Sequence, residues 1–559
     1  IHLPQSQNVH DDSQSLQLKI RIDFELYKPT AGVYFVMPDT ESYPNRTARK
    51  QMLSICHILT QKICMRNLDV LECGFHVSIL WRIVVLGKWS TMFPKTTKSC
   101  RVASANMMYV LHLSPAANRQ TTNDYDQTKT LCFKSETQVA ASDIVFAVGR
   151  FDATPDPVLP SKLMYYTLPG RRDVSLLASA EPTSKAFNFF ETQLGALPFS
   201  NFKLVFVENA YSDVIIGSSV AIISTHMLHS SDIIDQTYET RRKLASALAS
   251  QWFGCYVSIR TWSDAWIKHG IPGYMSYLFY QSIFGTNDFK SKILEDCEYV
   301  CNHPDPMPLF ALNLLSPQET YSKFYMKKSI LCMYMFEKEV GPDAFWKTLF
   351  NLVIPSTNGE PQDTNLTTHK FFKIAKKTTG QDMRSFADKW IYSKYLPHFS
   401  LGFGYNRSKG QTEIAFKQNK HFSGMLEVRI VESDGVAQDQ ELNFEDEYHE
   451  FCVVRRKKKR DEEIPAANLQ TNPSVPLGWI CFDTELNWIR KITFHQSEFM
   501  WINQLEQEKD VIAQLEAVDG LVQDAEFGST RAISALERVL ETSGFFYKVR
   551  TKAIFGLAK

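Results

Sequence analysis

Ser246 and Ser250 stand one helical turn apart in the chain, and His269 follows Ser246 by 23 positions. In the metal-binding pattern H-E-x-x-H, two imidazoles at this spacing hold one ion, and the glutamate between them acts as general base. Here the corresponding positions carry Ser246, Ala247 and Ser250. The spacing therefore predicts a helix that has the frame of a zinc site without its ligands.

The side chains at these positions cannot perform the chemistry of a zinc hydrolase. Zinc in proteins binds thiolate, imidazole or carboxylate, so the hydroxyls of Ser246 and Ser250 do not replace two histidines. Ala247 has no group that could take a proton from water. His269 alone does not supply the three protein ligands of a catalytic zinc, and we expect it to be a surface or partly buried histidine. The sequence therefore predicts no metal, no cofactor and no metal-assisted hydrolysis.

The residues around these positions resemble the zinc aminopeptidases, the family of aminopeptidase N. The run QWFG at 251–254 is similar to the end of that family's zinc helix. The run WSDAWIKHG at 262–270 is similar to the segment that supplies its third ligand, a glutamate where this chain has His269. The resemblance implies a peptidase fold whose zinc ligands have been replaced.

Two further landmarks of that family can be placed in this chain. The resemblance implies that Asp213, 33 positions before Ser246, stands where the family has the glutamate that holds the amino terminus of the substrate. It also implies that Tyr325 stands where the family has the tyrosine that steadies the oxyanion. An oxyanion donor without an activated water performs no hydrolysis, so we expect Tyr325 to be an aromatic residue on a buried helix.

A serine hydrolase is a second interpretation of the serines in this region. The nucleophile elbow G-x-S-x-G is absent, because Gly217-Ser218-Ser219 lacks the second glycine. His226 and His229 lie nearby, and no spacing in the sequence ties them to a serine and an acid. We therefore expect both histidines to be polar residues of a loop or a helix end.

Three phrases at 207–214, 222–258 and 262–274 together look like the family of transcription initiation factor TFIID subunit 2, and the similarity extends over most of 130–559. That family has an aminopeptidase-like body without the zinc ligands. The resemblance implies a non-enzymatic nuclear subunit of TFIID. It would scaffold other subunits, including the TATA-binding-protein-associated factors, and contact core promoter DNA in assembly of the RNA polymerase II preinitiation complex. The alternatives are an atypical zinc aminopeptidase and a cytosolic peptide-binding pseudopeptidase.

The composition agrees with a large globular chain. Its 559 residues are 44% hydrophobic, and 61 Lys and Arg balance 61 Asp and Glu, so any contact with DNA must come from local patches. Eleven scattered cysteines suggest reduced thiols in the cytosol or nucleus. The most apolar run of the atypical region, 74–87, contains Arg82 and is too short to cross a bilayer. The chain begins at Ile1, which predicts a fragment.

Periodicity and the resemblance together predict a multidomain α+β, aminopeptidase-like fold. The expected domains are a partial N-terminal β-domain at 1–153 in which 45–100 is atypical, a degenerate thermolysin-like and mostly helical peptidase domain at 154–395, a β-sandwich at 396–498, and the start of an α-helical repeat domain at 499–559. Within the first domain, two strands near residues 16–26 and 32–38 are expected in one antiparallel sheet. Prolines at 154–160 predict a linker.

Helical spacing near the C-terminus predicts core stripes on successive helices. One stripe is Trp501, Leu505, Ile512, Leu515 and Val518, and the next is Ile533, Leu536, Val539 and Leu540.

The longest loop of the expected sandwich carries six consecutive cations. Like charges repel and keep such a segment open, so it is a candidate for nuclear import or for contact with DNA phosphates. A plain solvated loop explains the run equally well, and the family resemblance favours the nuclear interpretation. These residues are Arg455, Arg456, Lys457, Lys458, Lys459 and Arg460.

Overall fold

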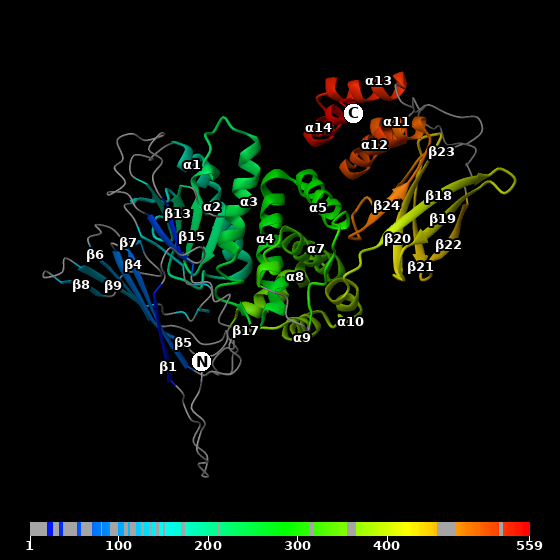
Figure 1. Cartoon of the computed structure of the whole chain (residues 1–559). Helices are drawn as coiled ribbons and strands as arrows, with labels where there is room; N and C mark the ends of the chain where they lie inside the picture. Colours follow the sequence, from blue (N-terminus) through cyan, green and yellow to red (C-terminus); the bar gives the residue numbers. More distant parts are fainter. Residues whose placement is uncertain are drawn as a thin grey trace, which may run out of the picture. The chain divides into compact units, whose positions relative to one another are not determined.

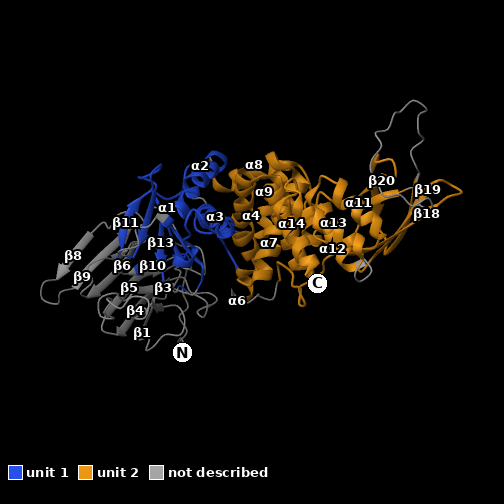
Figure 2. Cartoon of the chain, turned by 90° about the horizontal axis from the view of Figure 1, so that it is seen from above, with its two compact units in different colours: residues 1–261, 355–366 blue, residues 262–354, 367–559 orange. Residues whose placement is uncertain are grey.

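The computed structural model of the chain describes residues 151–558, with gaps at 169–173, 209, 211, 312–316, 355–364, 455–476 and 525–528 (Figure 1). Before residue 151 it describes the strands β1 to β10 and a few single residues. The chain forms two compact units, residues 1–261 with 355–366 and residues 262–354 with 367–559 (Figure 2). The division falls inside the region predicted as one peptidase domain.

The first strands of unit 1 form a six-stranded sheet, β1-β4-β5-β6-β9-β8, and a four-stranded sheet, β2-β3-β10-β7. The prediction that the first two strands share one antiparallel sheet is wrong, because β1 pairs in parallel with β4 and β2 pairs with β3. Alternation of apolar and polar residues identifies a strand, but it does not identify the strand with which it pairs. The atypical segment 45–100 contributes β3, β4, β5 and the first two residues of β6. The bounds are β1 Lys19–Glu25, β2 Val33–Val36, β3 Leu53–His57, β4 Val70–Ile79, β5 Trp81–Trp89, β6 Ser99–Ala105, β7 Val110–Leu111, β8 Arg119–Asn123, β9 Thr128–Lys134 and β10 Val145–Val148.

A mixed sheet follows, in the order β11-β12-β13-β15-β14. The pairs β12–β13 and β13–β15 are parallel, and the two edge strands are antiparallel to their neighbours. Every residue of β13 and β15 is buried, which is the pattern of strands covered on both faces. The bounds are β11 Asp152–Pro155, β12 Leu163–Thr167, β13 Phe202–Val207, β14 Val214–Gly217 and β15 Val220–Ser224.

The predicted linker at 154–160 is the end of β11 and the turn that leads to β12, so that prediction is wrong. Asp156 organises the turn: its carboxylate accepts hydrogen bonds from the backbone N–H groups of Val158 (2.8 Å) and Leu159 (2.7 Å) and from the hydroxyl of Tyr165 (2.5 Å). Prolines are as common in tight turns as in linkers, and the composition of the segment alone does not separate the two.

Three helices accompany the mixed sheet in unit 1: α1 (Val174–Ala180), α2 (Pro182–Leu194) and α3 (Asp235–Ala249) (Figure 1). The rings of Phe187 and Phe190 on α2 lie 6.3 and 6.2 Å from the ring of Trp252, edge to face. Aromatic pairs favour this geometry, and here they fix the residues that follow α3 against α2. A short parallel pair, β16 (Ser258–Ile259) and β17 (Asn365–Leu366), completes the described part of unit 1.

Unit 2 begins with the helices of the peptidase-like region. Gly270 and Gly273 on α4 allow it to approach α7: a Cβ at Gly270 would lie 2.7 Å from the carbonyl oxygen of Ser329, and one at Gly273 would lie 2.5 Å from Ile330. The bounds are α4 Ala265–Phe284, α5 Thr286–Cys301, α6 Pro317–Thr320, α7 Lys323–Val340, α8 Pro342–Val353, α9 Thr368–Thr379, α10 Arg384–Ala387 and a π-helical turn Asp388–Tyr392.

The predicted β-sandwich is present in unit 2, with sheets β22-β19-β18-β24 and β21-β20-β23. The rings of Phe399, Phe416, Phe444 and Trp488 pack together in its core, with centroids 4.8 to 5.6 Å apart. The bounds are β18 His398–Asn406, β19 Gln411–Gln418, β20 Gly424–Glu432, β21 Ala437–Phe444, β22 Tyr448–Val454, β23 Leu477–Phe482 and β24 Lys491–Phe494.

Four helices follow: α11 Glu498–Gln507, α12 Val511–Asp524, α13 Thr530–Glu541 and α14 Tyr547–Leu557. The first predicted stripe lies on two helices, because α11 ends before α12 begins. Asp510, between them, accepts hydrogen bonds from backbone N–H groups in the first turn of α12. Ile533 was predicted in the core and is 40% exposed. Among the described residues, no helix has the length and apolar character needed to cross a membrane.

A buried arginine joins three elements of unit 2. Arg490, just before β24, donates hydrogen bonds to the carboxylates of Asp483 (3.0 Å) and of Glu516 on α12 (3.0 Å). Its backbone N–H donates to the thiol sulfur of Cys297 on α5 (3.3 Å). The sandwich, the helices of the peptidase-like region and the C-terminal helices therefore meet at one residue, through its side chain and its backbone.

Candidate functional site

The positions expected to form the degenerate site are divided between the two units. Asp213 precedes β14, Ser246 and Ala247 lie on α3, and Ser250 follows the end of α3, all in unit 1. His269 lies on α4 and Tyr325 on α7, both in unit 2. The two helices that the spacing predicted are present, α3 in unit 1 and α4 in unit 2.

The serine hydroxyl at the end of α3 is used by the helix itself. Ser250 Oγ donates a hydrogen bond to the backbone carbonyl of Ser246, one turn earlier, at 2.8 Å. Ala247, between them, is fully buried. A hydroxyl bonded to the preceding turn is a common arrangement for serine in a helix and leaves no anionic oxygen for a metal. These positions do not fit a catalytic zinc.

Gln251 holds the end of α3 against the mixed sheet. Its side-chain oxygen accepts a hydrogen bond from the backbone N–H of Ser219 (2.7 Å), and its side-chain nitrogen donates to the carbonyls of Gly217 (3.1 Å) and Ala247 (3.3 Å). Ser219 has a positive φ of 60°, at the turn between β14 and β15. The fully buried amide is thus satisfied on both sides and ties the helix to this turn. Sequence reasoning assigned Gln251 no role of its own.

The carboxylate of Asp213 contacts two side chains of its own unit. Its carboxylate lies 2.5 Å from the ammonium of Lys243 on α3 and 2.9 Å from Nε2 of His226. The hydrogen bond from Lys243 is the largest cause of a lowered pKa of Asp213, and His226 lowers that pKa further. The ammonium of Lys243 is therefore paired with the carboxylate of Asp213. By resemblance, this carboxylate stands where aminopeptidases hold the amino group of a substrate.

The structure links His226 to a serine and an acid, which the sequence spacing did not reveal. Ser224 Oγ lies 2.7 Å from His226 Nδ1, and His226 Nε2 lies 2.9 Å from Asp213. These are the three residue types of a catalytic triad, and His226 lies in the short helical turn Thr225–Met227, a polar residue of a loop or helix end as the sequence predicted. Ser224 is only 3% exposed, however, and Asp213 is already neutralised by Lys243. The arrangement serves as a structural tie between the end of β15 and the start of β14.

His229 lies outside this tie. Its backbone N–H donates to Ser179 Oγ (2.8 Å), which donates in turn to the carbonyl of His229 (3.1 Å). The residue is 3% exposed and connects the loop before α3 to α1. It is a polar residue of a loop, as the sequence predicted, and it is buried.

His269 lies among aromatic rings of unit 2. Its ring is 4.9 Å from that of Tyr321 and 6.4 Å from that of Tyr325, edge to face in both cases. The Nε2 atom is buried and has no hydrogen-bond partner within the described part of the chain. Burial, together with the charge of Lys268, lowers the pKa of His269 to about 3, so the imidazole is neutral at physiological pH.

Tyr325 is fully buried on α7, as the sequence predicted. Its hydroxyl donates a hydrogen bond to the backbone carbonyl of Leu309 at 2.6 Å. Burial is the main cause of a strongly raised pKa, so the hydroxyl keeps its proton. A phenol has one proton to donate, and in this structure it is given to the backbone and not to an oxyanion.

Two remaining expectations concern cations and metals. The six cations at 455–460 lie outside the described residues. Within the residues that the structure describes, no three His, Cys, Asp or Glu side chains gather as a metal site would require.

Three known families match consecutive parts of the chain. The Peptidase family M1 domain matches residues 179–390, the TAF2 Ig-like domain matches 395–497, and the family described as TAF2-like, TPR repeats, matches 498–559. The structure resembles that of Legionella pneumophila aminopeptidase A in complex with aspartic acid, with a TM-score of 0.63 at 12% identity over 90% of this chain and 56% of that chain. The fold is therefore aminopeptidase-like, as predicted.

Curated relatives extend the similarity through the N-terminal strands. Transcription initiation factor TFIID subunit 2 of Gallus gallus is 28% identical over 97% of this chain and 48% of its own length. The protein of the same name from Danio rerio is 28% identical over 97% of this chain and 47% of its own length. The similarity is wider than the expected 130–559, and the chain spans about half the length of these relatives.

Proposed function

Because the chain resembles transcription initiation factor TFIID subunit 2 along 97% of its length, we propose that it is a subunit of the general transcription factor TFIID. In this proposal it works in the nucleus, scaffolds other TFIID subunits including the TATA-binding-protein-associated factors, and contacts core promoter DNA during assembly of the RNA polymerase II preinitiation complex. The observation that carries the proposal is the continuous similarity across the peptidase-like region, the sandwich and the C-terminal helices.

The proposal includes the absence of peptidase activity. Ser246, Ala247 and Ser250 offer neither zinc ligands nor a general base. Asp213 is bonded to Lys243, and the proton of Tyr325 is given to a backbone carbonyl. Each group that an aminopeptidase would turn toward its substrate is replaced or engaged within the chain.

Co-purification of the native protein tests the assignment to TFIID. We expect other TFIID subunits, including TATA-binding-protein-associated factors, at stoichiometric amounts in a nuclear extract. Recovery of the protein alone from the cytosol, without those subunits, would contradict the assignment and favour a cytosolic peptide-binding pseudopeptidase.

Metal analysis and turnover test the absence of activity. We expect substoichiometric zinc in the purified protein and no hydrolysis of amino-acid amides above a buffer control. An active aminopeptidase assayed in parallel confirms that the assay detects hydrolysis. Stoichiometric zinc together with chelator-sensitive hydrolysis would establish the atypical zinc aminopeptidase instead.

A further inference from the structure

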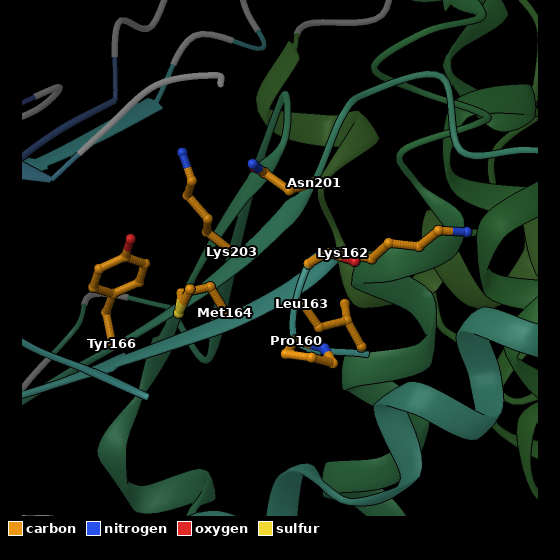
Figure 3. Close-up of a pocket in the computed structure, with 8 residues that line it drawn as sticks. Pro160, Lys162, Leu163, Met164, Tyr166, Asn201 and Lys203 are labelled. Carbon is orange, nitrogen blue, oxygen red and sulfur yellow. The ribbon is translucent and has the colours of Figure 1, made fainter. Parts of the chain in front are cut away.

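One pocket of the described surface, of about 190 Å³, opens at the start of β12 and β13 in unit 1 (Figure 3). Two lysines line it, and both are engaged within the chain. The ammonium of Lys162 lies 2.7 Å from Glu191, and Lys203 interacts with another group of the chain. The residues described as lining this pocket therefore offer no unpaired cation to a ligand, whereas a strand of the sandwich in unit 2 offers unpaired backbone groups.

That strand is β21, which lies at the edge of the sheet β21-β20-β23. Among the described strands it pairs with β20 alone. A strand at the edge of a sheet has backbone N–H and C=O groups that point away from its neighbour. An extended segment of another polypeptide can bind to these groups as a further strand.

The hydrogen-bond register identifies the residues of β21 that face outward. At the turn between the two strands, the backbone N–H of Glu432 donates to the carbonyl of Val436 at 3.0 Å, so this pair is hydrogen-bonded. In an antiparallel pair, hydrogen-bonded and non-hydrogen-bonded positions alternate, and the backbone groups of the latter point away from the partner strand. The residues of β21 at these outward-facing positions are Ala437, Asp439, Glu441 and Asn443.

The other side of β20 supports the same register. The carbonyl of Glu427 accepts a hydrogen bond from the backbone N–H of Asp483, directly after β23, at 2.9 Å. Glu427 is the partner of Glu441, and because its backbone groups point to β23, those of Glu441 point out of the sheet. Within the described part of the chain, the outward backbone groups of all four residues have no hydrogen-bond partner.

The side chains along this edge are acidic. Asp439 and Glu441 lie on the exposed face of the sheet, whereas Leu442 is buried on the opposite face. Asp439 is paired with Arg429 of β20 at 2.8 Å. Glu441 stands directly opposite Glu427, and like charges at facing positions destabilise a strand pair. Among the described residues, no cation pairs with Glu441.

We propose that the edge of β21 is a docking site for an extended basic segment of a partner polypeptide, which adds to the sheet with lysine or arginine opposite Asp439 and Glu441. Residues that exchange hydrogen bonds with these positions have their side chains on the same face of the sheet. A cation opposite Glu441 offsets its repulsion with Glu427. A second copy of β21 would place acid against acid, which is how charges on an edge strand prevent self-association. The inference concerns this strand edge and does not depend on the proposed role in transcription.

Peptides test the docking site on the wild-type chain. The basic probe is fluorescein-labelled acetyl-Lys-Val-Lys-Val-Lys-Val-Lys-amide, in which valine favours the strand and the lysines share one face. Fluorescence anisotropy at physiological salt measures binding. The methyl NMR signal of Met425, the partner of Asn443 on β20, locates it and is assigned with Met425→Leu. We expect saturable binding that shifts this methyl, and at least tenfold weaker binding of the peptide with glutamate in place of lysine.

Methylation of the peptide backbone separates strand pairing from attraction between charges. In the added strand, the N–H groups of the lysines point to β21 and those of the valines point away from it. We expect Nα-methylation of the two central lysines, which keeps their charges, to weaken binding at least tenfold. Nα-methylation of two valines is the matched control and should leave the affinity within threefold of that of the unmodified peptide.

Variants of the chain test the same contacts from the other side. Glu441→Gln removes the carboxylate, and we expect it to weaken binding of the basic peptide severalfold. Asn443→Pro removes an outward N–H that does not bond to β20, and we expect it to weaken binding at least fivefold. Glu450→Gln, on the edge strand β22 of the other sheet, is the control and should leave the affinity unchanged.

Absence of saturable binding by the basic peptide would overturn the proposal, and so would equal binding of the basic and acidic peptides. Equal binding of the peptides methylated at lysine and at valine would show attraction between charges without strand pairing. Binding that leaves the Met425 methyl unshifted would place the peptide elsewhere on the chain. All these comparisons use the wild-type chain, so they decide the proposal even where a variant does not fold.

Discussion

Three side chains at the positions expected to form a degenerate site are bonded to other groups of the chain. Ser250 bonds to the helix backbone, Asp213 to Lys243 and His226, and Tyr325 to the carbonyl of Leu309. Sequence alone identified that Ser246, Ala247 and Ser250 lack the chemistry of zinc ligands, because residue type decides that question. It could not identify these bonds, since their partners come from other elements. A tie such as Ser224–His226–Asp213 depends on where a strand end and a loop meet.

Tyr325→Phe tests the structural role of the buried hydroxyl. The substitution removes the donor and leaves the carbonyl of Leu309 unsatisfied, so we expect a loss of about 1–3 kcal/mol in the free energy of unfolding. Chemical denaturation with urea measures it. Tyr299→Phe on α5, where the ring is 36% exposed, is the control and should change stability by less than about 0.5 kcal/mol. A neutral Tyr325→Phe would show that the hydrogen bond contributes nothing to folding.

Lys243→Met tests the pair with Asp213 through its dependence on pH. The folded-state pKa of Asp213 lies below 3.8, so its contribution to stability is present above pH 3.8 and is lost as pH falls through the lower value. The variant should therefore be less stable than wild type near neutral pH, by less than about 1 kcal/mol because the carboxylate is 44% exposed, and the difference should shrink in acid. Urea denaturation at several pH values measures this. A difference that grows in acid would contradict the assignment.

At the scale of elements, periodicity succeeded where one local pattern determines the structure. The β-sandwich predicted at 396–498 is present, in two sheets of four and three strands. The errors arose where tertiary contacts decide. The segment 154–160 is a turn because Asp156 bonds to Val158, Leu159 and Tyr165. The first C-terminal stripe falls on two helices because Asp510 starts a new one.

Arg490→Met tests the junction of α5, the sandwich and α12. The variant leaves the buried carboxylate of Asp483 without its cation, and loss of one partner of a buried pair costs about 3–5 kcal/mol. Burial already raises the pKa of Asp483 to about 6, above its ordinary 3.8. The stability that a raised pKa contributes is present below pH 3.8 and is lost as pH rises through about 6, so the cost of the variant should be larger at pH 7.5 than at pH 5.

Urea denaturation at these two pH values measures that difference. Arg384→Met, at an exposed pair with Asp382, is the control and should leave the unfolding curve unchanged. Equal destabilisation at both pH values would show that Asp483 does not respond to Arg490.

At the scale of the whole molecule, the balanced charge restricts how DNA could be bound. With 61 cations and 61 anions, no overall field attracts the phosphate backbone, and the contact in the proposed function must come from a local group. The sequence predicted one such group, at 455–460, and the described part of the structure does not reach it. The order of the peptidase-like region, the sandwich and the C-terminal helices was predictable through family resemblance.

Replacing residues 455–460 with alanine tests this group on a core promoter duplex. Each phosphate contact contributes about −0.9 to the slope of log affinity against log salt concentration. We expect weaker binding at every salt concentration and a smaller slope, by about 1 for each cation that contacts a phosphate. Fluorescence anisotropy measures both quantities. As a control, the exposed lysines Lys347, Lys373 and Lys377 are replaced together. Unchanged affinity and slope in the 455–460 variant would remove this segment from the DNA interface.

The side-chain amide of Gln251 shows how a helix in an aminopeptidase-like fold can be held in place without a metal ion. In a zinc site, an ion that binds two side chains of a helix and a third ligand from another element also links that helix to its surroundings. Here two hydrogen bonds of the neighbouring Gln251, one accepted from the backbone N–H of Ser219 and one donated to the carbonyl of Gly217, hold the end of the helix against the turn between β14 and β15. A helix held in this way would keep its position without an ion.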